Sequence, residues 1–575
     1  MTEHGHVNED RRTLLRNVAG APVAAGVVDL LGADAIPTPQ SVESSWEGGF
    51  WDDEDAGDVF PQSVASGDPT ASGAICWTRI DPAQYASSAS LELVVAADEA
   101  FERDRRAFAV GTGGIADHDY TVRVDLDGHL SPGRRYYYRF VYDGVASETG
   151  QFRTLPATGA SPDSVRFGVV NCQDYRNGYY GAFGHLARAD LDFLLHLGDF
   201  IYEYGGFTDD ADFYDYFDRY VDLPSGRDVA VDLTDFRHLY RTYRGDRLLQ
   251  AALENHALIP IWDDHEIVDN RYWDYEADRP RPGEGAHPYE GDPAAIRRLF
   301  AAGIRAWWEY MPARVGYDPD AESLQDRLRL YRSFEFGDLL DLVVTDERLY
   351  RTSPTDGDKI GFAFDDDPGP VTEADIDETM LGDEQREWFL NQVTGSDATW
   401  TAWANEVLLT DFRLETEYAS VFNADAWDGF AAERRYLLDR LQAAGVENLL
   451  VCSGDLHSSL AGYVAPTEEA ATDPDRRVGV ELMAPAVTSA NLRERLDVLD
   501  AAAIERRVSR NVVDINPSVE AFDSGHWGYA VVELTPESCE FTAYAVDKSV
   551  DSAAAPREEL FSYRVPAGEP ELQRL

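Results

Sequence analysis

The chain reads RFGVVNC at residues 166–172, GYYGAFGHLARAD at 178–190 and LDFLLHLGD at 191–199. The first and third segments are short apolar runs of strand length, and the middle segment carries apolar residues at helical spacing. The succession predicts a β-α-β unit, in which a helix crosses between two parallel strands. We therefore expect an α/β core, a sheet with helical crossovers, in the larger part of the chain.

Further apolar runs of strand length follow toward the C-terminus. Several end abruptly in a polar cluster rather than in a neutral turn, which places reactive side chains at strand ends. The runs are HALIPIW (256–262), LLDLVVTD (339–346), TWTAWAN (399–405), NLLVCSGD (448–455), GVELMAP (479–485), GYAVVELT (528–535) and CEFTAYAVD (539–547).

The segment 58–156 has a different pattern. Alternating runs such as AICWTRI (74–80) and SLELVVAAD (90–98) are punctuated by Gly, Pro and Asp. Antiparallel strands show this pattern, so we expect an N-terminal all-β sandwich of the fibronectin or immunoglobulin type. The predicted organisation is a signal segment at 1–40, an acidic linker at 41–57, the β-sandwich at 58–156 and an α/β domain at 162–575.

The chain is strongly acidic. Its 575 residues include 106 Asp and Glu against 50 Lys and Arg, a formal charge of -56, and Lys359 and Lys548 are the only lysines. Such a surface repels nucleic acid, so nucleic-acid binding is not expected. The charge is spread along the chain rather than gathered in a tail, which favours a solvated surface that is soluble where salt screens it. Abundant acid with little lysine resembles the proteins of haloarchaea, and we expect a need for molar salt.

The N-terminus indicates export. The sequence DRRTLLR (10–16), followed by the mildly apolar stretch 18–31, resembles a twin-arginine signal that the twin-arginine translocase would carry across the membrane. An ordinary amphipathic segment is the alternative, since Asp29 interrupts the apolar stretch. No other stretch has the apolar length of a transmembrane span. We expect an exported protein, extracellular or at the cell surface.

Polar groups at five strand ends are the candidates for function. They are NCQDY (171–175), GDFIY (198–202), WDDHE (262–266), WANE (403–406) and SGDLH (453–457). In open α/β sheets, sites form at the carboxyl ends of strands, so these groups are expected to meet in one crevice. Attack on a phosphoester needs metal ions that neutralise phosphate oxygens and supply hydroxide near neutral pH. Asp199 is the expected bridge between two metals. A Gly-Asp after a strand, taken alone, is more often a turn or a helix N-cap, and it is Tyr202 together with the other four clusters that favours a metal site.

These motifs, in this order, resemble those of PhoD-type alkaline phosphatases and phosphodiesterases of the metallophosphoesterase superfamily. GDFIYEY (198–204) looks like the Gly-Asp-x-x-Tyr element of purple acid phosphatases and PhoD enzymes, and NCQDYRNGYYGA (171–182) like the PhoD version of the first motif. WDDHE resembles the third motif and GDLH (454–457) the last. SVASGDPTASGAICWTRI (63–80), TDERLYR (345–351), MLGDEQREWFL (380–390), TWTAWANEV (399–407) and DAWDGF (425–430) also look like PhoD segments.

The resemblance implies a fold, a set of ligands and a reaction. The fold would be the four-layer α/β/β/α metallophosphatase sandwich, and the reaction would be hydrolysis of small phosphate esters by metal-activated water, for scavenging phosphate outside the cytoplasm. Fe³⁺ would be held by Cys172, Asp199, Tyr202 and His457, and Ca²⁺ by Asp199, Asp264 and Asp455, with Asn405 as a less certain ligand. Thiolate, phenolate and carboxylate suit a trivalent metal and oxygen donors suit calcium, while Zn²⁺ or Mn²⁺ is compatible with the same residue types.

Residues beside these ligands have expected roles as well. By resemblance, His265 is a general acid or a phosphate contact. Arg271, Arg348 and Arg351 are further phosphate contacts by position alone. Asp263 and Glu266 either orient the ligands or are surface charges at a strand end.

Two questions stay open at the level of sequence. Monoester and diester hydrolysis are not distinguished, because the shape of the pocket decides between them. A protein of another class, a non-catalytic cell-surface binding protein stabilised by calcium, would also use the carboxylates, but it leaves Cys172, Tyr202 and His265 without a role.

Overall fold

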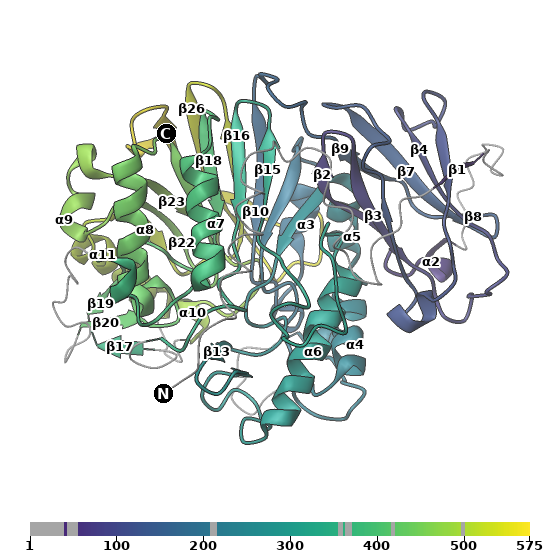
Figure 1. Cartoon of the computed structure of the whole chain (residues 1–575), viewed down its shortest axis with the longest axis horizontal. Coiled ribbons are helices and arrows are strands. Elements are labelled where there is room, and N and C mark those ends of the chain that lie inside the picture. Colours follow the sequence, from purple (N-terminus) through teal and green to yellow (C-terminus); the bar gives the residue numbers. More distant parts are fainter. Residues whose placement is uncertain are drawn as a thin grey trace, which may run out of the picture.

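The computed structural model describes residues 40–42, 56–206, 216–354, 360–362, 371–415, 420–495 and 501–575. The predicted signal segment lies outside the described residues apart from residue 40, and so does the acidic linker apart from 41–42 and 56–57. In Figure 1 the N-terminal strands lie at the right-hand end and two large sheets run through the middle. In the part of the chain that is described, no helix is long and apolar enough to cross a membrane.

The first large sheet has ten strands, of which the central four are parallel. The predicted β-α-β unit is confirmed: β10 and β11 pair in parallel, and helix α3 (Gly181–Leu186) connects them. The strand order is β28 (Gln573–Arg574), β27 (Arg557–Pro566), β26 (Ser538–Val546), β25 (Gly528–Leu534), β10 (Val165–Val170), β11 (Phe193–Leu197), β12 (Ala257–Ile261), β2 (Val64–Thr70), β3 (Gly73–Arg79) and β6 (Thr121–Asp125).

The second large sheet has seven strands, again with a parallel centre made by β16, β18, β21 and β23. Its outer strands run antiparallel to their neighbours. The order is β15 (Arg332–Phe336), β16 (Leu340–Val344), β18 (Trp400–Ala404), β21 (Leu449–Ser453), β23 (Gly479–Met483), β22 (Ser459–Val464) and β24 (Val519–Asp523).

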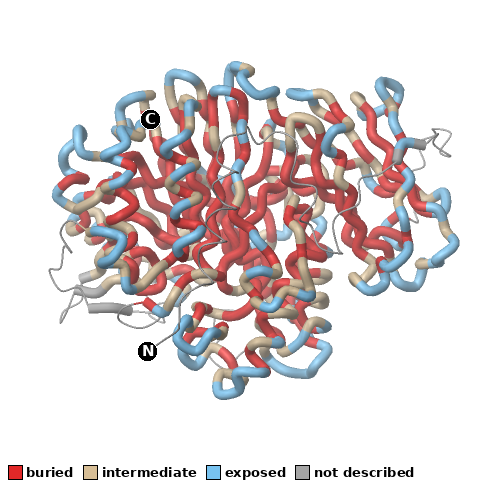
Figure 2. Tube along the Cα trace, in the orientation of Figure 1, coloured by how far each residue is buried: buried red, intermediate tan, exposed pale blue. Residues whose placement is uncertain are grey.

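Alternating side chains of the second sheet face two different cores. On β21, Leu450 and Cys452 join the large core shared with the first sheet, whereas Leu449 and Val451 pack with residues of the helices on the other side. Successive strand residues point to opposite faces, so a strand between two apolar layers is apolar throughout. The sheets touch directly where the rings of Phe193 and Phe336 lie 5.0 Å apart. Figure 2 shows this continuous buried interior along both sheets.

Helices flank both sheets. Helix α5 contacts β2 and β12 of the first sheet, helix α4 packs against α6, and helix α7 contacts β16 of the second sheet. The aspartates that precede α4, α5 and α6 each accept two backbone N–H bonds, which is the usual N-cap. The helices are α2 (Ala56–Val59), α4 (Leu233–Tyr243), α5 (Arg247–Asn255), α6 (Pro293–Tyr310), α7 (Gly382–Thr394), α8 (Ala431–Ala444), α9 (Glu468–Ala471), α10 (Leu492–Arg495) and α11 (Ala501–Ile515).

The N-terminal strands divide between two sheets. Six of them form a separate sheet, and β2, β3 and β6 face it while also extending the first large sheet through the parallel contact of β2 with β12. Alternation on β3 shows the dual role, because Cys76 faces the N-terminal core and Trp77 faces the main core. The separate sheet contains β1 (Gln40–Val42), β4 (Leu91–Ala96), β5 (Arg106–Ala109), β7 (Arg135–Tyr142), β8 (Val145–Ala146) and β9 (Gly150–Arg153).

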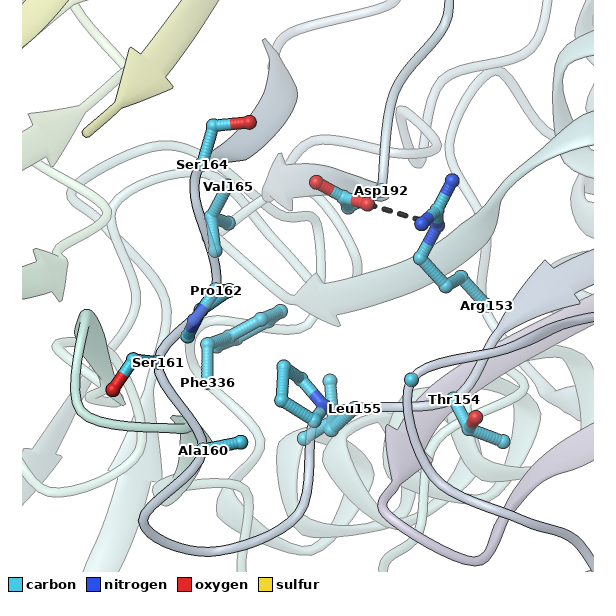
Figure 3. A pocket seen from close by; sticks show the side chains of 12 residues that line it. Arg153, Thr154, Leu155, Ala160, Ser161, Pro162, Ser164, Val165, Asp192 and Phe336 are labelled. Atoms are coloured by element: carbon cyan, nitrogen blue, oxygen red, sulfur yellow. Dashed lines mark ion pairs between the residues drawn. The ribbon is translucent and has the colours of Figure 1, made fainter.

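The connection out of the N-terminal strands runs past a small cavity of about 220 Å³. Figure 3 shows Leu155, Pro162 and Phe336 around it, with Arg153 paired to Asp192 at 3.0 Å. Two short sheets complete the fold: β13 (Tyr272–Asp274) with β14 (Arg279–Arg281), and β20 (Ser420–Asn423) between β17 (Ile360–Phe362) and β19 (Leu414–Glu415).

Candidate metal centre

Polar groups at four of the five predicted strand ends converge on one site. Cys172 follows β10, Asp199 follows β11 and Asp264 follows β12, three neighbours in the first sheet, while Asp455 follows β21 of the second sheet. The parallel strands of each sheet end at the same edge, and the packing of the sheets brings both edges together. Three overlapping clusters with metal-ligand geometry result, and in each cluster the ligand atoms lie within 4.8 Å of one another.

The backbone at these positions is unusual. Cys172, Asp199, Asp455 and His457 have φ of 51°, 55°, 65° and 53°, in the left-handed region that residues other than glycine rarely adopt. Left-handed non-glycine residues store strain of about 1–3 kcal/mol each and concentrate at functional sites. Here the sharp turn directs each side chain from its strand end into the crevice.

Gly198 is required by the approach of two strand ends. A Cβ on Gly198 would lie 2.4 Å from the backbone nitrogen and Cβ of Asp263, and the glycine has φ +96°. Only a residue without a side chain lets the ends of β11 and β12 come this close. This glycine therefore sets the spacing between Asp199 and Asp263.

The first cluster joins Cys172, Asp199 and His457. The Tyr202 hydroxyl donates to Asp199 Oδ2 at 2.7 Å and lies 3.2 Å from His457 Nε2. His457 Nδ1 bonds the Ala490 carbonyl at 2.8 Å, which leaves Nε2 as the lone-pair nitrogen facing the cluster. The four residues expected to bind iron are thus within contact of one another.

Two further clusters extend from the first. Asp199 also groups with Asp264 and His265, and Asp264 groups with Asp263 and Asp455. Asp199 therefore belongs to two clusters, as a carboxylate that bridges two metals would. Asp263 is an additional candidate ligand, because one of its buried carboxylate oxygens has no hydrogen-bond partner. The sequence signal was the pair of consecutive aspartates at the strand end.

Asn405 lies at the end of β18, but its amide is engaged elsewhere. Its Oδ1 accepts from Trp427 Nε1 at 2.8 Å, and its Nδ2 donates to the Val407 carbonyl. The structure thus places this predicted calcium ligand in a buried hydrogen-bond network next to the centre.

The three arginines proposed as phosphate contacts are fully buried among other partners. Arg348 pairs with Asp263, with Asp425 at 2.6 Å and with Asp455 at 2.8 Å. Arg351 pairs with Asp425 at 2.5 Å, and Arg271 donates to the Asp263 carbonyl at 2.7 Å. Arg348 holds Asp263 and Asp455 of the centre in place, Arg351 holds Asp425, and Arg271 holds the backbone of the β12 end.

Glu203 was not singled out from the sequence, yet it holds His265. Its carboxylate lies 2.7 Å from His265 Nδ1 and also accepts the backbone N–H of Asp269. Burial acts to lower the pKa of His265, but Glu203, Asp264 and Asp199 outweigh it and raise that pKa well above its usual range. The ring lies against Tyr202, with centroids 4.2 Å apart. The signal in the sequence was the acid directly after the Tyr of GDFIYEY.

Glu266 is a buried residue that orients the ligands, and not a surface charge at the strand end. It is buried and accepts backbone N–H bonds from Asp199, Phe200 and Asp263, at 3.2, 2.7 and 2.7 Å. Burial raises the pKa of Glu266 to about 7, although these bonds oppose the shift. One carboxyl group thus ties the end of β11 to the end of β12.

The charge balance of the centre fits bound cations. Burial, reinforced by neighbouring acids, raises the pKa of Cys172, Asp199, Tyr202 and Asp455. Buried acidic groups at this density are stable as anions only when cations compensate them, and metal ions serve that purpose. The donor set has a thiol, a phenol and an imidazole at one end and carboxylates at the other, which suits two kinds of metal.

Comparison with known proteins identifies the class. The family model of PhoD-like phosphatases matches residues 167–543, and the model of the PhoD-like phosphatase N-terminal domain matches residues 45–156. The chain therefore belongs to the PhoD-like phosphatase family, a family of enzymes that hydrolyse phosphoesters.

Individual relatives agree with this assignment. The chain is 29% identical to alkaline phosphatase D of Bacillus subtilis (strain 168) over 485 residues, which cover 83% of this chain and 76% of the relative. The solved structure of PhoD aligns with a TM-score of 0.74 at 26% identity, covering 90% of this chain and 92% of that one. The mixed α/β fold with an N-terminal β-rich region is thus that of PhoD, and the chain is a PhoD-like alkaline phosphatase homologue.

Proposed function

We propose that this protein hydrolyses phosphate esters, mono- or diesters, with water activated at a mixed metal centre. The observation that carries the proposal is Asp199, whose carboxylate belongs to two adjoining clusters of potential ligands. A bridging carboxylate places two cations next to one phosphate, the arrangement that in-line displacement at phosphorus requires. Family membership supports the same reaction class.

The donor atoms suggest how the metals are divided. Cys172, Asp199, Tyr202 and His457 would hold Fe³⁺, and Asp199, Asp264 and Asp455 would hold Ca²⁺, with Asp263 as an additional oxygen donor and Asn405 beside them. Zn²⁺ or Mn²⁺ would fit the same residue types. When bound, such cations neutralise phosphate oxygens and lower the pKa of water toward neutrality.

His265 would supply the proton in this reaction. Glu203 fixes its Nδ1 at 2.7 Å and keeps the ring cationic, so Nε2 carries the proton that can be donated. Geometry and protonation state are the two requirements for a general acid. In this proposal, the ester oxygen that leaves phosphorus takes that proton, and the product departs as an alcohol.

The wider properties of the chain remain part of the proposal. We assign residues 162–575 to a four-layer metallophosphatase sandwich and residues 58–156 to a fibronectin- or immunoglobulin-like domain. Before that domain, we assign residues 1–40 to a twin-arginine signal and residues 41–57 to an acidic linker. The paired large sheets and the family matches support this division. Export would place the enzyme outside the cytoplasm, where it would scavenge phosphate. The acid-rich composition favours a salt-loving, haloarchaeal source.

A calcium-stabilised surface binding protein is the alternative. It predicts calcium without iron, no hydrolysis, and no function for Cys172 or Tyr202. The short Tyr202–Asp199 and Tyr202–His457 contacts speak against it, because a purely structural calcium site needs neither phenol nor imidazole.

The test combines metal analysis, absorption spectroscopy and hydrolysis of p-nitrophenyl phosphate in molar salt. We expect iron, a visible band from tyrosinate bound to ferric iron that Tyr202→Phe removes, and turnover that Asp199→Asn abolishes. Asp190→Asn, at an exposed ion pair remote from the centre, is the matched control and should behave as wild type. Colourless, iron-free protein without hydrolysis would overturn the proposal.

A further inference from the structure

A cavity of about 410 Å³ opens beside the metal centre. Two of the proposed metal ligands, Asp455 and His457, form part of its lining. They come from different clusters, since His457 groups with Cys172 and Asp199 whereas Asp455 groups with the aspartates after β12. A phosphate held by both clusters would therefore have this cavity immediately next to it.

The larger side chains of the remaining lining are apolar: Phe412, Leu414, Phe422, Leu456, Leu492, Val508 and Phe522. Smaller or polar residues complete it, namely Asn423, Ser458, Ala490, Asn491, Arg495 and Ser524. The apolar side chains come from separate parts of the chain, including β20, α10, α11 and β24, so that several elements are needed to close the space. The rings of Phe412 and Phe522 contact each other, with centroids 5.3 Å apart.

These walls form an apolar site in a chain whose surface is strongly acidic. Leu456, Val508 and Phe522 are only partly buried, although they pack on the apolar core behind them. Ligand pockets have this character, with apolar walls and few polar groups, at volumes of about 300–1,000 Å³. A dry cavity of about 150 Å³ lined by Leu, Ile and Phe is enough to bind benzene, so this one has room for a ring or a short alkyl chain.

The position of His265 indicates which part of a substrate would enter. His265 is not among the residues that line the cavity. Its ring lies against Tyr202 and is fixed by Glu203. The ester oxygen that takes a proton from His265 must leave on the side of His265. A group in the cavity is therefore one that stays on phosphorus.

Arg495 adds a positive charge at this cavity. Arg495 is exposed, and its Nε donates to the Ala490 carbonyl at 3.2 Å. The same carbonyl bonds His457 Nδ1. A phosphodiester carries a single negative charge and two organic groups. One guanidinium beside an apolar wall accommodates both the negative charge and an organic group of such a substrate.

We infer that this cavity is a subsite for the non-reacting, apolar substituent of a phosphodiester. The inference rests on the proposed function and names the substrate class that the sequence left open. The oxygen of a water molecule bonds to phosphorus, the bond to the second ester oxygen breaks, and that oxygen leaves as an alcohol with the proton from His265. The proton that the water gives up passes to solvent, from which His265 is protonated again. The apolar ester remains on phosphorus, so the product is a phosphomonoester that still occupies the cavity.

The experiment uses diesters that share p-nitrophenolate as the leaving group and differ in the second ester, from methyl through propyl to butyl. Burial of one methylene contributes about 0.8 kcal/mol, or roughly a fourfold change in kcat/KM. We expect kcat/KM of the full-length enzyme in molar salt to rise by up to about 60-fold from methyl to butyl. Release of p-nitrophenolate reports every rate.

Two variants locate the effect. Val508→Trp fills the cavity and Phe522→Ala widens it, so each should reduce the butyl-to-methyl ratio of kcat/KM toward one. A general loss of activity cancels in this ratio. Leu560→Ala, half-buried on β27, is the control and should keep the wild-type ratio.

The outcomes separate the subsite from the reaction itself. A flat alkyl series with measurable methyl turnover overturns the subsite and leaves the proposed hydrolysis intact. A steep series that survives in both variants places the selectivity elsewhere and also overturns the inference. If Val508→Trp depresses p-nitrophenyl phosphate more than the methyl diester, the cavity takes the leaving group instead. Absence of hydrolysis for every ester refutes the proposed function.

Discussion

His196 makes the stability of the fold depend on acid. It lies on β11 and is fully buried, with Nδ1 accepting the Gly198 N–H at 3.2 Å and Nε2 facing Gln173 Oε1 at 3.2 Å. Burial lowers the pKa of His196 to about 3. A proton on Nδ1 would point at the Gly198 N–H, whose hydrogen bond Nδ1 accepts in the fold, and would break that bond. The ring is therefore neutral in the folded state at pH values well above about 3.

The sign and size of the effect follow from linkage. The unfolded chain takes up a proton near the ordinary histidine pKa of about 6.5, whereas the folded chain does not until about pH 3. Stability from this group is present above the unfolded pKa and is lost as the pH falls toward 3. Between about pH 7 and about pH 4.5 the loss is about 2.5 kcal/mol, because each pH unit below 6.5 contributes about 1.36 kcal/mol.

The assay is urea unfolding in molar salt at these two pH values, with wild type compared with His196→Gln. Glutamine cannot titrate, so we expect its free energy of unfolding to fall by about 2.5 kcal/mol less than that of the wild type over this range. Carboxylates that titrate in both proteins cancel in the difference. His129→Gln, at a half-exposed ring, controls for loss of a histidine elsewhere. Equal pH dependence in wild type and His196→Gln would show that His196 titrates normally.

Three other perturbations test the framework of the centre. Asp68→Ala removes the two 2.8 Å hydrogen bonds that the Arg332 guanidinium donates to Asp68, and it should lower the free energy of unfolding by about 3–5 kcal/mol. The control Asp190→Ala, at an exposed ion pair, should lower the free energy of unfolding by less than about 1 kcal/mol. Urea titration measures both changes. Gly198→Ala should reduce kcat/KM by about 100-fold because a Cβ displaces Asp263, whereas Gly226→Ala, also at positive φ but in open space, should retain activity. Removal of metal by a chelator should lower the thermal midpoint and abolish hydrolysis, and metal readdition should restore both.

The parallel strands could be predicted because their sequences have a single physical explanation. A strand buried on both faces must be predominantly apolar, as FLLHL and LLVCS are, and the polar residue that follows it has to lie at the sheet edge. This is why Asp199 and Asp455 could be assigned to one crevice. The same reasoning gave no distance between them, because the relative placement of two sheets depends on packing across the whole core.

Other features were hidden because their local sequence is ambiguous. Strand β2 reads VASGDPT, with Gly, Asp and Pro that disfavour a central strand, yet it pairs with β12 about 190 residues later in the chain. Asp68 within it is buried and bonded to Arg332, a partner that sequence periodicity cannot reveal. Glu203 was not recognised as an orienting group, and the sequence left Glu266 open between an orienting group and a surface charge, because a carboxylate next to a ligand looks the same whether it faces solvent or a backbone N–H.

The arginines show most clearly why residue type alone does not assign a role. The sequence position of Arg348, beside the predicted ligands, suggested a phosphate contact. In the structure its guanidinium instead pairs with Asp263 and Asp455, two members of the same cluster, and neutralises them. Among the described residues, no ion pair joins an arginine to the cluster of Cys172, Asp199 and His457, where His265 is the cation that most strongly offsets Asp199. The two ends of the centre therefore differ in charge compensation as well as in donor chemistry. The end with thiol, phenol and imidazole has the greater uncompensated demand for positive charge, which is the physical reason to expect the more highly charged metal there.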